Sequence, residues 1–129
     1  MDYFKVVNDN CGHETGDTVL CRVAEKLGEA LRGCDIAGRW GGEEFLIILP
    51  EAGVKEALDA AYRLRDQVKT IRLPELQTSE SGKDLPLSLS ASLGVSTYRP
   101  GESYEETLRR TDDAMYRAKA QGRDRVEQF

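Results

Sequence analysis

Hydrophobic side chains recur with helical spacing in three stretches of this chain. In residues 18–31 and 54–71, apolar positions return every three or four residues, which is typical of a helix with one buried face. A third such stretch lies between Ser103 and Gly122. Ser103, with Glu106 three residues later, has the pattern of a capping box, and Gly122 predicts the end of that helix.

Strand patterns lie between and after these helices. Residues 36–40 and 45–49 flank two glycines as the arms of a hairpin do, and the second arm is almost wholly apolar. We therefore expect that arm to be covered on both faces. Apolar residues alternate with serine and glycine in 87–95, which predicts a half-buried strand, and 125–129 predicts a short final strand. This order of elements predicts an α/β or α+β sandwich around one central sheet.

Two polar segments predict loops. Residues 8–13 have loop composition, with Thr15 or Asp17 as the cap of the helix that follows and Gly33 as its C-terminal stop. Residues 74–83 are polar as well and predict a second loop. The sequence contains no internal repeat and no linker, so we expect its 129 residues to form one domain.

Composition excludes some classes of function. The net charge of -5 argues against a nonspecific nucleic-acid binder, because phosphate backbones select basic faces, but it allows a nucleotide bound together with cations. No apolar run is long enough to cross a membrane and no signal-peptide pattern opens the sequence, so we expect a cytoplasmic domain. The three cysteines lack a CxxC spacing, which predicts free thiols rather than a zinc site or a disulfide framework.

The segment richest in chemistry is Arg39-Trp40-Gly41-Gly42-Glu43-Glu44-Phe45. Adjacent carboxylates beside a glycine turn suit a divalent cation that carries a phosphate. Neighbouring residues of a strand point to opposite faces, so Glu43 and Glu44 reach one metal only if the turn distorts that alternation. A solvated acidic hairpin tip is the simpler interpretation of the pair alone.

Asn8 and Asp17 are candidates for reading a purine base. A carboxylate accepts from the amino group and ring N–H of guanine, and an amide can donate. Their commonest use, as turn and cap residues, is the alternative. His13, between them, is the single histidine of the sequence, and we expect a structural hydrogen-bonding role for it rather than that of a base.

Three cations are candidates for binding phosphate, and each has a simpler interpretation. Lys5 can act as a point charge or be a plain surface lysine. Lys119 and Arg123 are spaced i, i+4 and share one face if the third helix extends that far. They bind phosphate only if that helix end faces the Glu43 turn, and otherwise they are favourable charges at a helix C-terminus.

Arg32 and Asp35 lie three residues apart just before the glycine turn. An arginine and an aspartate so placed can clamp a guanine base, with the arginine stacking or binding in bidentate fashion. A surface ion pair is the alternative.

Several separated blocks of the sequence, in order, resemble the GGDEF family, the catalytic domains of diguanylate cyclases. The blocks are Asp2-Tyr3-Phe4-Lys5-Val6-Val7-Asn8-Asp9, Gly12-His13, Gly16-Asp17, Arg39-Trp40-Gly41-Gly42-Glu43-Glu44-Phe45, and 113–123. The resemblance implies a palm-like, mostly antiparallel central sheet flanked by helices, similar to nucleotidyl cyclase catalytic domains. It also implies condensation of two GTP molecules to cyclic di-GMP with two Mg²⁺ or Mn²⁺ ions. The active form would be a homodimer, normally with a sensor or regulatory domain upstream.

The resemblance assigns roles residue by residue. Glu43 would bind metal and activate the 3′-hydroxyl, Glu44 would support it, and the backbone carbonyl of Met1 would be a further metal ligand. The remaining assignments are guanine recognition by Asn8 and Asp17 with His13 and Phe4 beside them, triphosphate contacts by Lys5, Lys119 and Arg123, and an RxxD product-inhibition site of Arg32 and Asp35 with Arg63.

The sequence departs from the family at its start. The family pattern has an Asp-x-Asp after an apolar strand; Asp2 matches the second aspartate and Met1 the residue before it, while the first aspartate, a principal metal ligand, has no counterpart. The resemblance therefore implies an N-terminally incomplete domain with weakened metal binding. A non-catalytic cyclic di-GMP receptor that uses Arg32 and Asp35 is the alternative function.

Overall fold

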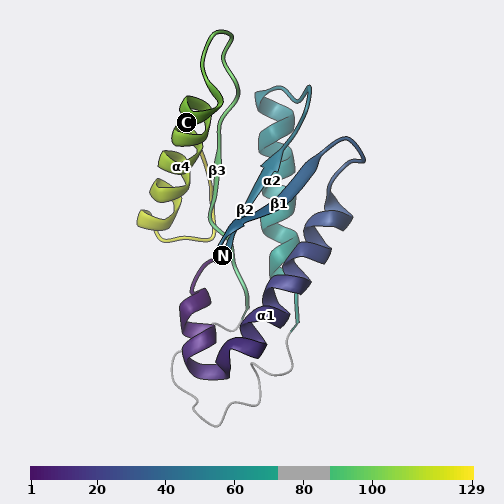
Figure 1. Ribbon diagram of the computed structural model, residues 1–129, viewed down its shortest axis with the longest axis vertical. Coiled ribbons are helices and arrows are strands. Elements are labelled where there is room, and N and C mark those ends of the chain that lie inside the picture. Colours follow the sequence, from purple (N-terminus) through teal and green to yellow (C-terminus); the bar gives the residue numbers. More distant parts are fainter. Residues whose placement is uncertain (73–87) are drawn as a thin grey trace.

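Three helices and two small sheets make up the part of the chain that the computed structural model describes, residues 1–72 and 88–129 (Figure 1). The mixed α/β class predicted from the sequence is confirmed. In chain order the elements are α1 (Phe4–Ala30), β1 (Ile36–Gly41), β2 (Glu44–Ile48), α2 (Val54–Lys69), β3 (Leu93–Val95), α4 (Tyr104–Ala120) and β4 (Val126–Gln128). The loop predicted at 74–83 lies outside the described residues.

The first helix begins much earlier than predicted. Residues 8–11 are helical, so the loop predicted for 8–13 is wrong apart from a kink at Gly12, whose φ of 81° and ψ of 165° leave the helical region (Figure 1). The fully buried Val7 explains this, because its packing into the core outweighs the weak helix propensity of the polar residues beside it.

Neither predicted end signal of this helix acts as a cap. Thr15 donates its hydroxyl back to the carbonyl of Cys11, 2.9 Å away, inside the helix. The helix ends at Ala30, and Leu31 already has extended geometry, so Gly33 is not its stop.

The predicted hairpin is confirmed. β1 and β2 are antiparallel, with Ile36 opposite Ile48 and an irregularity between Arg39 and Gly41, and Gly42 turns the chain with a φ of 50°. The expectation that both faces of the second arm are covered is wrong for the described structure. Phe45 packs against the core, whereas Ile36 and Ile48 on the opposite face are 58% and 51% exposed.

The second sheet pairs β3 with β4 in parallel, and α4 lies directly on it. A Cβ atom on Gly94 would lie 2.2 Å from the carbonyl oxygen of Thr111 and 2.4 Å from the nitrogen of Met115, so the glycine permits this close approach. Of the strand predicted for 87–95, the described residues 88–95 form a strand only at 93–95, although Leu89 and Ala91 are buried as their alternation predicts.

The sequence predicted one central sheet, whereas the described strands form two sheets of two strands each. Met1 and Asp2 bridge them. The Met1 amino group donates to the carbonyl of Glu43, and the Asp2 amide donates to the carbonyl of Ser90.

Candidate functional site

The glycine turn, the first residue and the end of α4 meet in space. The amino group of Met1 lies 2.9 Å from the backbone oxygen of Glu43, and the ammonium of Lys119 lies 3.6 Å from a carboxylate oxygen of Glu44. Burial first, and then the nearby Lys119 charge, lower the pKa of the Met1 amino group. The end of α4 therefore faces the turn, which was the condition for Lys119 to act there.

The Lys119–Glu44 pair is weak. Both side chains are partly exposed and their charged atoms are 3.6 Å apart, so the pair contributes at most about 1 kcal/mol to stability. An anion with more charge than one carboxylate can therefore compete for Lys119 at small cost.

Arg123 does not share a helical face with Lys119, because α4 ends at Ala120. Its backbone has a φ of 63°, and its guanidinium lies over the ring of Tyr3, 4.8 Å from the centroid. This contact brings Arg123 to the start of the chain and hence toward Met1. The expected i, i+4 relation is therefore replaced by a tight turn.

Asn8, Phe4 and Gly16 come together across the kink of α1. The Asn8 side chain lies so close over Gly16 that an added Cβ atom would be 1.9 Å from its Oδ1 atom and 3.2 Å from the Phe4 ring. That oxygen is buried without a hydrogen-bond donor among the described residues. An unsatisfied buried acceptor costs about 1–3 kcal/mol, so this atom suits a ligand that brings a donor.

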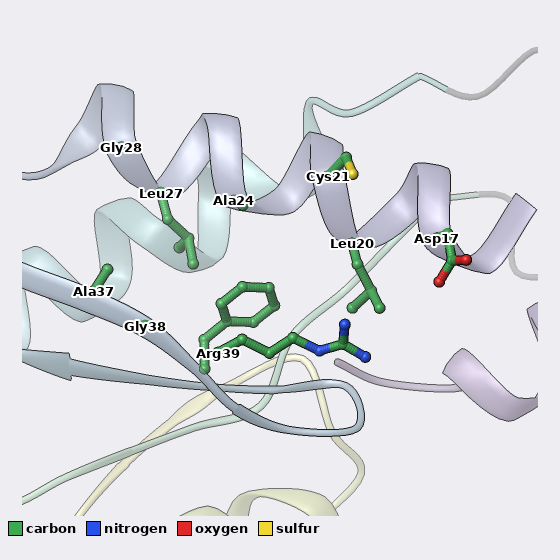
Figure 2. Close-up of a pocket in the computed structure, with 10 residues that line it drawn as sticks. Asp17, Leu20, Cys21, Ala24, Leu27, Gly28, Ala37, Gly38 and Arg39 are labelled. Atoms are coloured by element: carbon green, nitrogen blue, oxygen red, sulfur yellow. The ribbon is translucent and has the colours of Figure 1, made fainter. Parts of the chain in front are cut away.

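Asp17 follows Gly16 and lies at one end of a groove of about 560 Å³ between α1 and the hairpin (Figure 2). Its walls are mostly apolar and include Leu20, Leu27 and Phe45, and the Arg39 side chain extends toward the Asp17 end. The sequence had indicated Asp17 but not the groove, which forms only when the apolar stripe of α1 faces the hairpin.

The two other candidates on α1, Lys5 and His13, are exposed. The described contacts do not bring either of them to the Glu43 turn. Their predicted roles stay predictions.

Arg32 and Asp35 bind each other. The guanidinium donates to the carboxylate at 2.8 Å, and the Arg32 backbone amide donates to it at the same distance. The hydrogen bond from the Arg32 side chain, the largest influence, lowers the pKa of the Asp35 carboxyl. Arg63 reaches from α2 to the Ala30 carbonyl at 3.3 Å, so the structure brings all three predicted residues of the RxxD site to the end of α1.

The described residues do not complete a metal site. Among them, no three histidine, cysteine or acidic side chains gather closely enough to hold an ion. Asp2 is 3% exposed, and its carboxylate already accepts from Ser90, Ser92 and the amide of Asp124. Glu43, Glu44 and the Met1 carbonyl remain as protein donors, and Mg²⁺ held by them would complete its six oxygens with water and substrate phosphates.

Sequence reasoning missed the part that Asp2 and Tyr3 play. Their partners Ser90, Ser92 and Arg123 lie 88 or more residues away along the chain, and no local pattern or spacing connects them. The blocks that resemble the family did include Asp2, but a residue that matches the family pattern does not show which groups its carboxylate binds.

Comparison with known proteins decides the family. The family model described as "Diguanylate cyclase, GGDEF domain" matches residues 1–125. The chain belongs to the GGDEF family. This confirms the relationship indicated by the sequence blocks.

Curated relatives of this GGDEF domain are diguanylate cyclases of Escherichia coli. DgcM of strain K12 is 43% identical over 125 residues, which are 97% of this chain and 28% of that protein. DosC of the same strain is 39% identical over 127 residues, 98% of this chain and 26% of that protein. The chain thus spans little more than a quarter of the length of these relatives.

Solved structures share the fold. The coiled coil and GGDEF domain of DgcB from Caulobacter crescentus, in complex with c-di-GMP, superposes with a TM-score of 0.88 at 34% identity over 99% of this chain and 65% of that one. Diguanylate cyclase SiaD from Pseudomonas aeruginosa, in complex with its activator SiaC, gives 0.85 at 41% identity over 99% of this chain and 46% of that one. No helix among residues 1–72 and 88–129 is long and apolar enough to cross a membrane.

Proposed function

We propose that residues 1–129 form one diguanylate cyclase domain that condenses two GTP molecules to cyclic di-GMP and pyrophosphate. The observation that carries this proposal is the approach of Lys119 to the Glu43–Glu44 turn, next to the Met1 backbone. This contact places a cation that can bind phosphate, Lys119, next to the carboxylates that can accept a proton from the reacting hydroxyl.

Asn8 and Asp17 give the site its preference for guanine. The unpaired Oδ1 of Asn8 and the Asp17 carboxylate are acceptors, and guanine offers an amino group and a ring N–H as donors. Adenine presents an acceptor at the corresponding ring nitrogen. ATP would leave an acceptor facing another acceptor, which is costly in a buried site. Phe4 and His13 complete the surroundings of the base.

The reaction joins two nucleotides by in-line displacement. The 3′-oxygen of one GTP attacks the α-phosphorus of the other, the bond to the β-phosphate oxygen breaks, and pyrophosphate leaves. Glu43 accepts the hydroxyl proton, and Lys5, Lys119 and Arg123 neutralise triphosphate charge. A second displacement closes the ring: the 3′-oxygen of the second nucleotide attacks the α-phosphorus of the first, and a second pyrophosphate leaves. Two copies of the domain, each with one GTP, therefore face each other in a homodimer.

Two Mg²⁺ or Mn²⁺ ions are the cofactors implied by the family, and they would supply charge neutralisation at the phosphates. Glu43 and the Met1 carbonyl are the donors this chain offers, with Glu44 supporting them. Because the first aspartate of the family's Asp-x-Asp has no counterpart among these 129 residues, we expect weak metal binding and slow turnover by them.

A second function, binding of cyclic di-GMP without catalysis, is supported by the cluster of Arg32, Asp35 and Arg63. In a cyclase the same cluster would serve product inhibition.

Because GTP is a cytoplasmic nucleotide, we place the domain in the cytoplasm, with a regulatory domain upstream in the parent protein.

Product formation tests the proposal. The chain is incubated with GTP and excess Mg²⁺, and cyclic di-GMP is measured for the wild type, Glu43→Gln and the matched surface control Glu25→Gln. We expect product from the wild type and the control, and a loss of about 10²-fold or more in Glu43→Gln. Absence of product with retained binding of cyclic di-GMP would favour the receptor instead.

A further inference from the structure

The segment after α4 has an unusual backbone. Gly122, Arg123 and Asp124 have φ values of 110°, 63° and 50°, so three successive residues lie in the left-handed region. For the two residues that carry a side chain this conformation is unfavourable and persists only where the surroundings enforce it.

Asp2 supplies that enforcement from the other end of the chain. Its buried carboxylate accepts from the Asp124 amide at 3.1 Å, and it is itself fixed by the hydroxyls of Ser90 at 2.9 Å and Ser92 at 2.7 Å. Lys69 of α2 binds the Asp124 carboxylate at 2.8 Å and holds the turn from the other side.

Tyr3 extends the same clamp to a side chain that carries charge. Tyr3 has a φ of 56°, and its ring lies beneath the guanidinium of Arg123, 4.8 Å from the centroid. Asp2 therefore fixes the backbone of the turn, and its neighbour fixes the direction of the Arg123 side chain. This contact favours one direction of the Arg123 side chain before any ligand arrives.

We propose that Asp2 is a positioning residue for triphosphate binding, which acts by holding the Gly122–Asp124 turn and, with Tyr3, the guanidinium of Arg123. This inference rests on the proposed function, because it takes Arg123 as a contact of the GTP phosphates. Asp2 itself touches neither nucleotide nor metal, since it is buried and its carboxylate already accepts from three donors of the protein. A preoriented guanidinium binds phosphate more tightly because less side-chain freedom is lost.

Asp2→Asn is the informative substitution. It keeps the shape but removes the negative charge of the carboxylate, so the hydrogen bond from the Asp124 amide is no longer charge-assisted and becomes weaker. The amide of Asp124 then loses protection, so its hydrogen exchange should become at least tenfold faster. This readout needs no nucleotide.

Affinity for GTP and for GMP is then measured by titration in Mg²⁺ for the wild type, Asp2→Asn, Arg123→Ala and the double variant. We expect GTP affinity to fall roughly tenfold in each single variant, GMP affinity to change less than about twofold, and the double variant to bind GTP no more weakly than Arg123→Ala. Ser103→Ala, which removes the helix cap of α4, is the control for general destabilisation, and its ratio of GTP to GMP affinity should stay unchanged.

The outcomes separate the two proposals. If Asp2→Asn lowers GTP and GMP affinity together, or adds fully to Arg123→Ala, Asp2 has a general structural role and the inference is overturned. If the wild type binds no GTP, the proposed function fails and this inference fails with it. Should Asp2→Asn not fold, Tyr3→Leu removes the ring beneath Arg123, and it must show the same loss specific to triphosphate and the same lack of additivity.

Discussion

Asn8 and Gly16 lie against each other at the kink of α1, and the acceptor oxygen of Asn8 is buried without a donor. A ligand that donates a hydrogen bond to this oxygen would remove the cost of the unsatisfied acceptor. The Oδ1 atom of Asn8 is thus held by its close contact with Gly16 rather than by a hydrogen bond. Small changes in volume should therefore affect binding strongly.

Gly16→Ala tests this contact. The new Cβ atom would lie 1.9 Å from the Asn8 oxygen, so the Asn8 side chain must move away from the base site. We expect GTP affinity to fall about tenfold, as for a lost hydrogen bond in a buried site, measured by calorimetric titration. Gly16→Ala in an Asn8→Ala background should add little to that loss, and full additivity would contradict the explanation.

The Arg32–Asp35 pair predicts a specific pH dependence of stability. Hydrogen bonding to Arg32 lowers the pKa of Asp35 in the folded state, so the pair stabilises the fold above the unfolded-state pKa of about 3.9. That contribution is lost as the pH falls through the lower folded-state pKa. Urea unfolding of the wild type and Asp35→Asn should show a stability difference at pH 7 that shrinks below pH 4. A difference independent of pH would contradict it.

At the scale of elements, patterns with clear periodicity were predicted correctly. The capping box of Ser103 and Glu106 forms with both of its hydrogen bonds, and the hairpin and the final strand lie where the sequence placed them. The loop predicted at 8–13 was wrong because local propensity favoured a turn, whereas the burial of Val7 favours a helix. Spacing along one helix also did not reveal that α4 ends before Arg123.

Two glycine substitutions separate the effect of close packing between elements from the effect of helix propensity. Gly94→Ala would drive a Cβ atom into the backbone of α4 and should destabilise the domain by about 3 kcal/mol or more. Gly28→Ala, in α1 with open space around it, should instead stabilise it by roughly 0.5–1 kcal/mol. Thermal and urea unfolding measure both. Equal effects would contradict the close approach of β3 and α4.

At the scale of the whole molecule, contacts between the chain ends join the two small sheets. Asp2 meets Ser90 and Asp124, and Met1 meets Glu43, so the site depends on residues that only the folded chain brings together. The sequence identified the Lys119 and Glu43 regions through separate motifs. The sequence did not predict that these two regions meet. It made their contact only the condition for phosphate binding by Lys119, because sequence spacing carries no information about the packing of α4 against the hairpin.

The product-inhibition hypothesis belongs at this scale because Arg32 and Arg63 come from different helical regions. Arg32→Ala should abolish inhibition by added cyclic di-GMP and weaken its binding by about tenfold or more, since it removes a guanidinium able to stack or bind in bidentate fashion. Initial rates with increasing cyclic di-GMP measure this. Arg22→Ala, on the exposed face of α1, is the control. Unchanged inhibition in Arg32→Ala would refute the assignment.

The rate of cyclic di-GMP formation as a function of protein concentration tests the central claim most directly. If each domain holds one GTP and two domains must meet, the rate per mole of protein should rise with protein concentration and level off once the dimer is saturated. GTP should be consumed and ATP should not. No cyclic di-GMP at any protein concentration would contradict the account. So would a rate per mole that stays constant from concentrations at which the protein is monomeric to those at which it is dimeric.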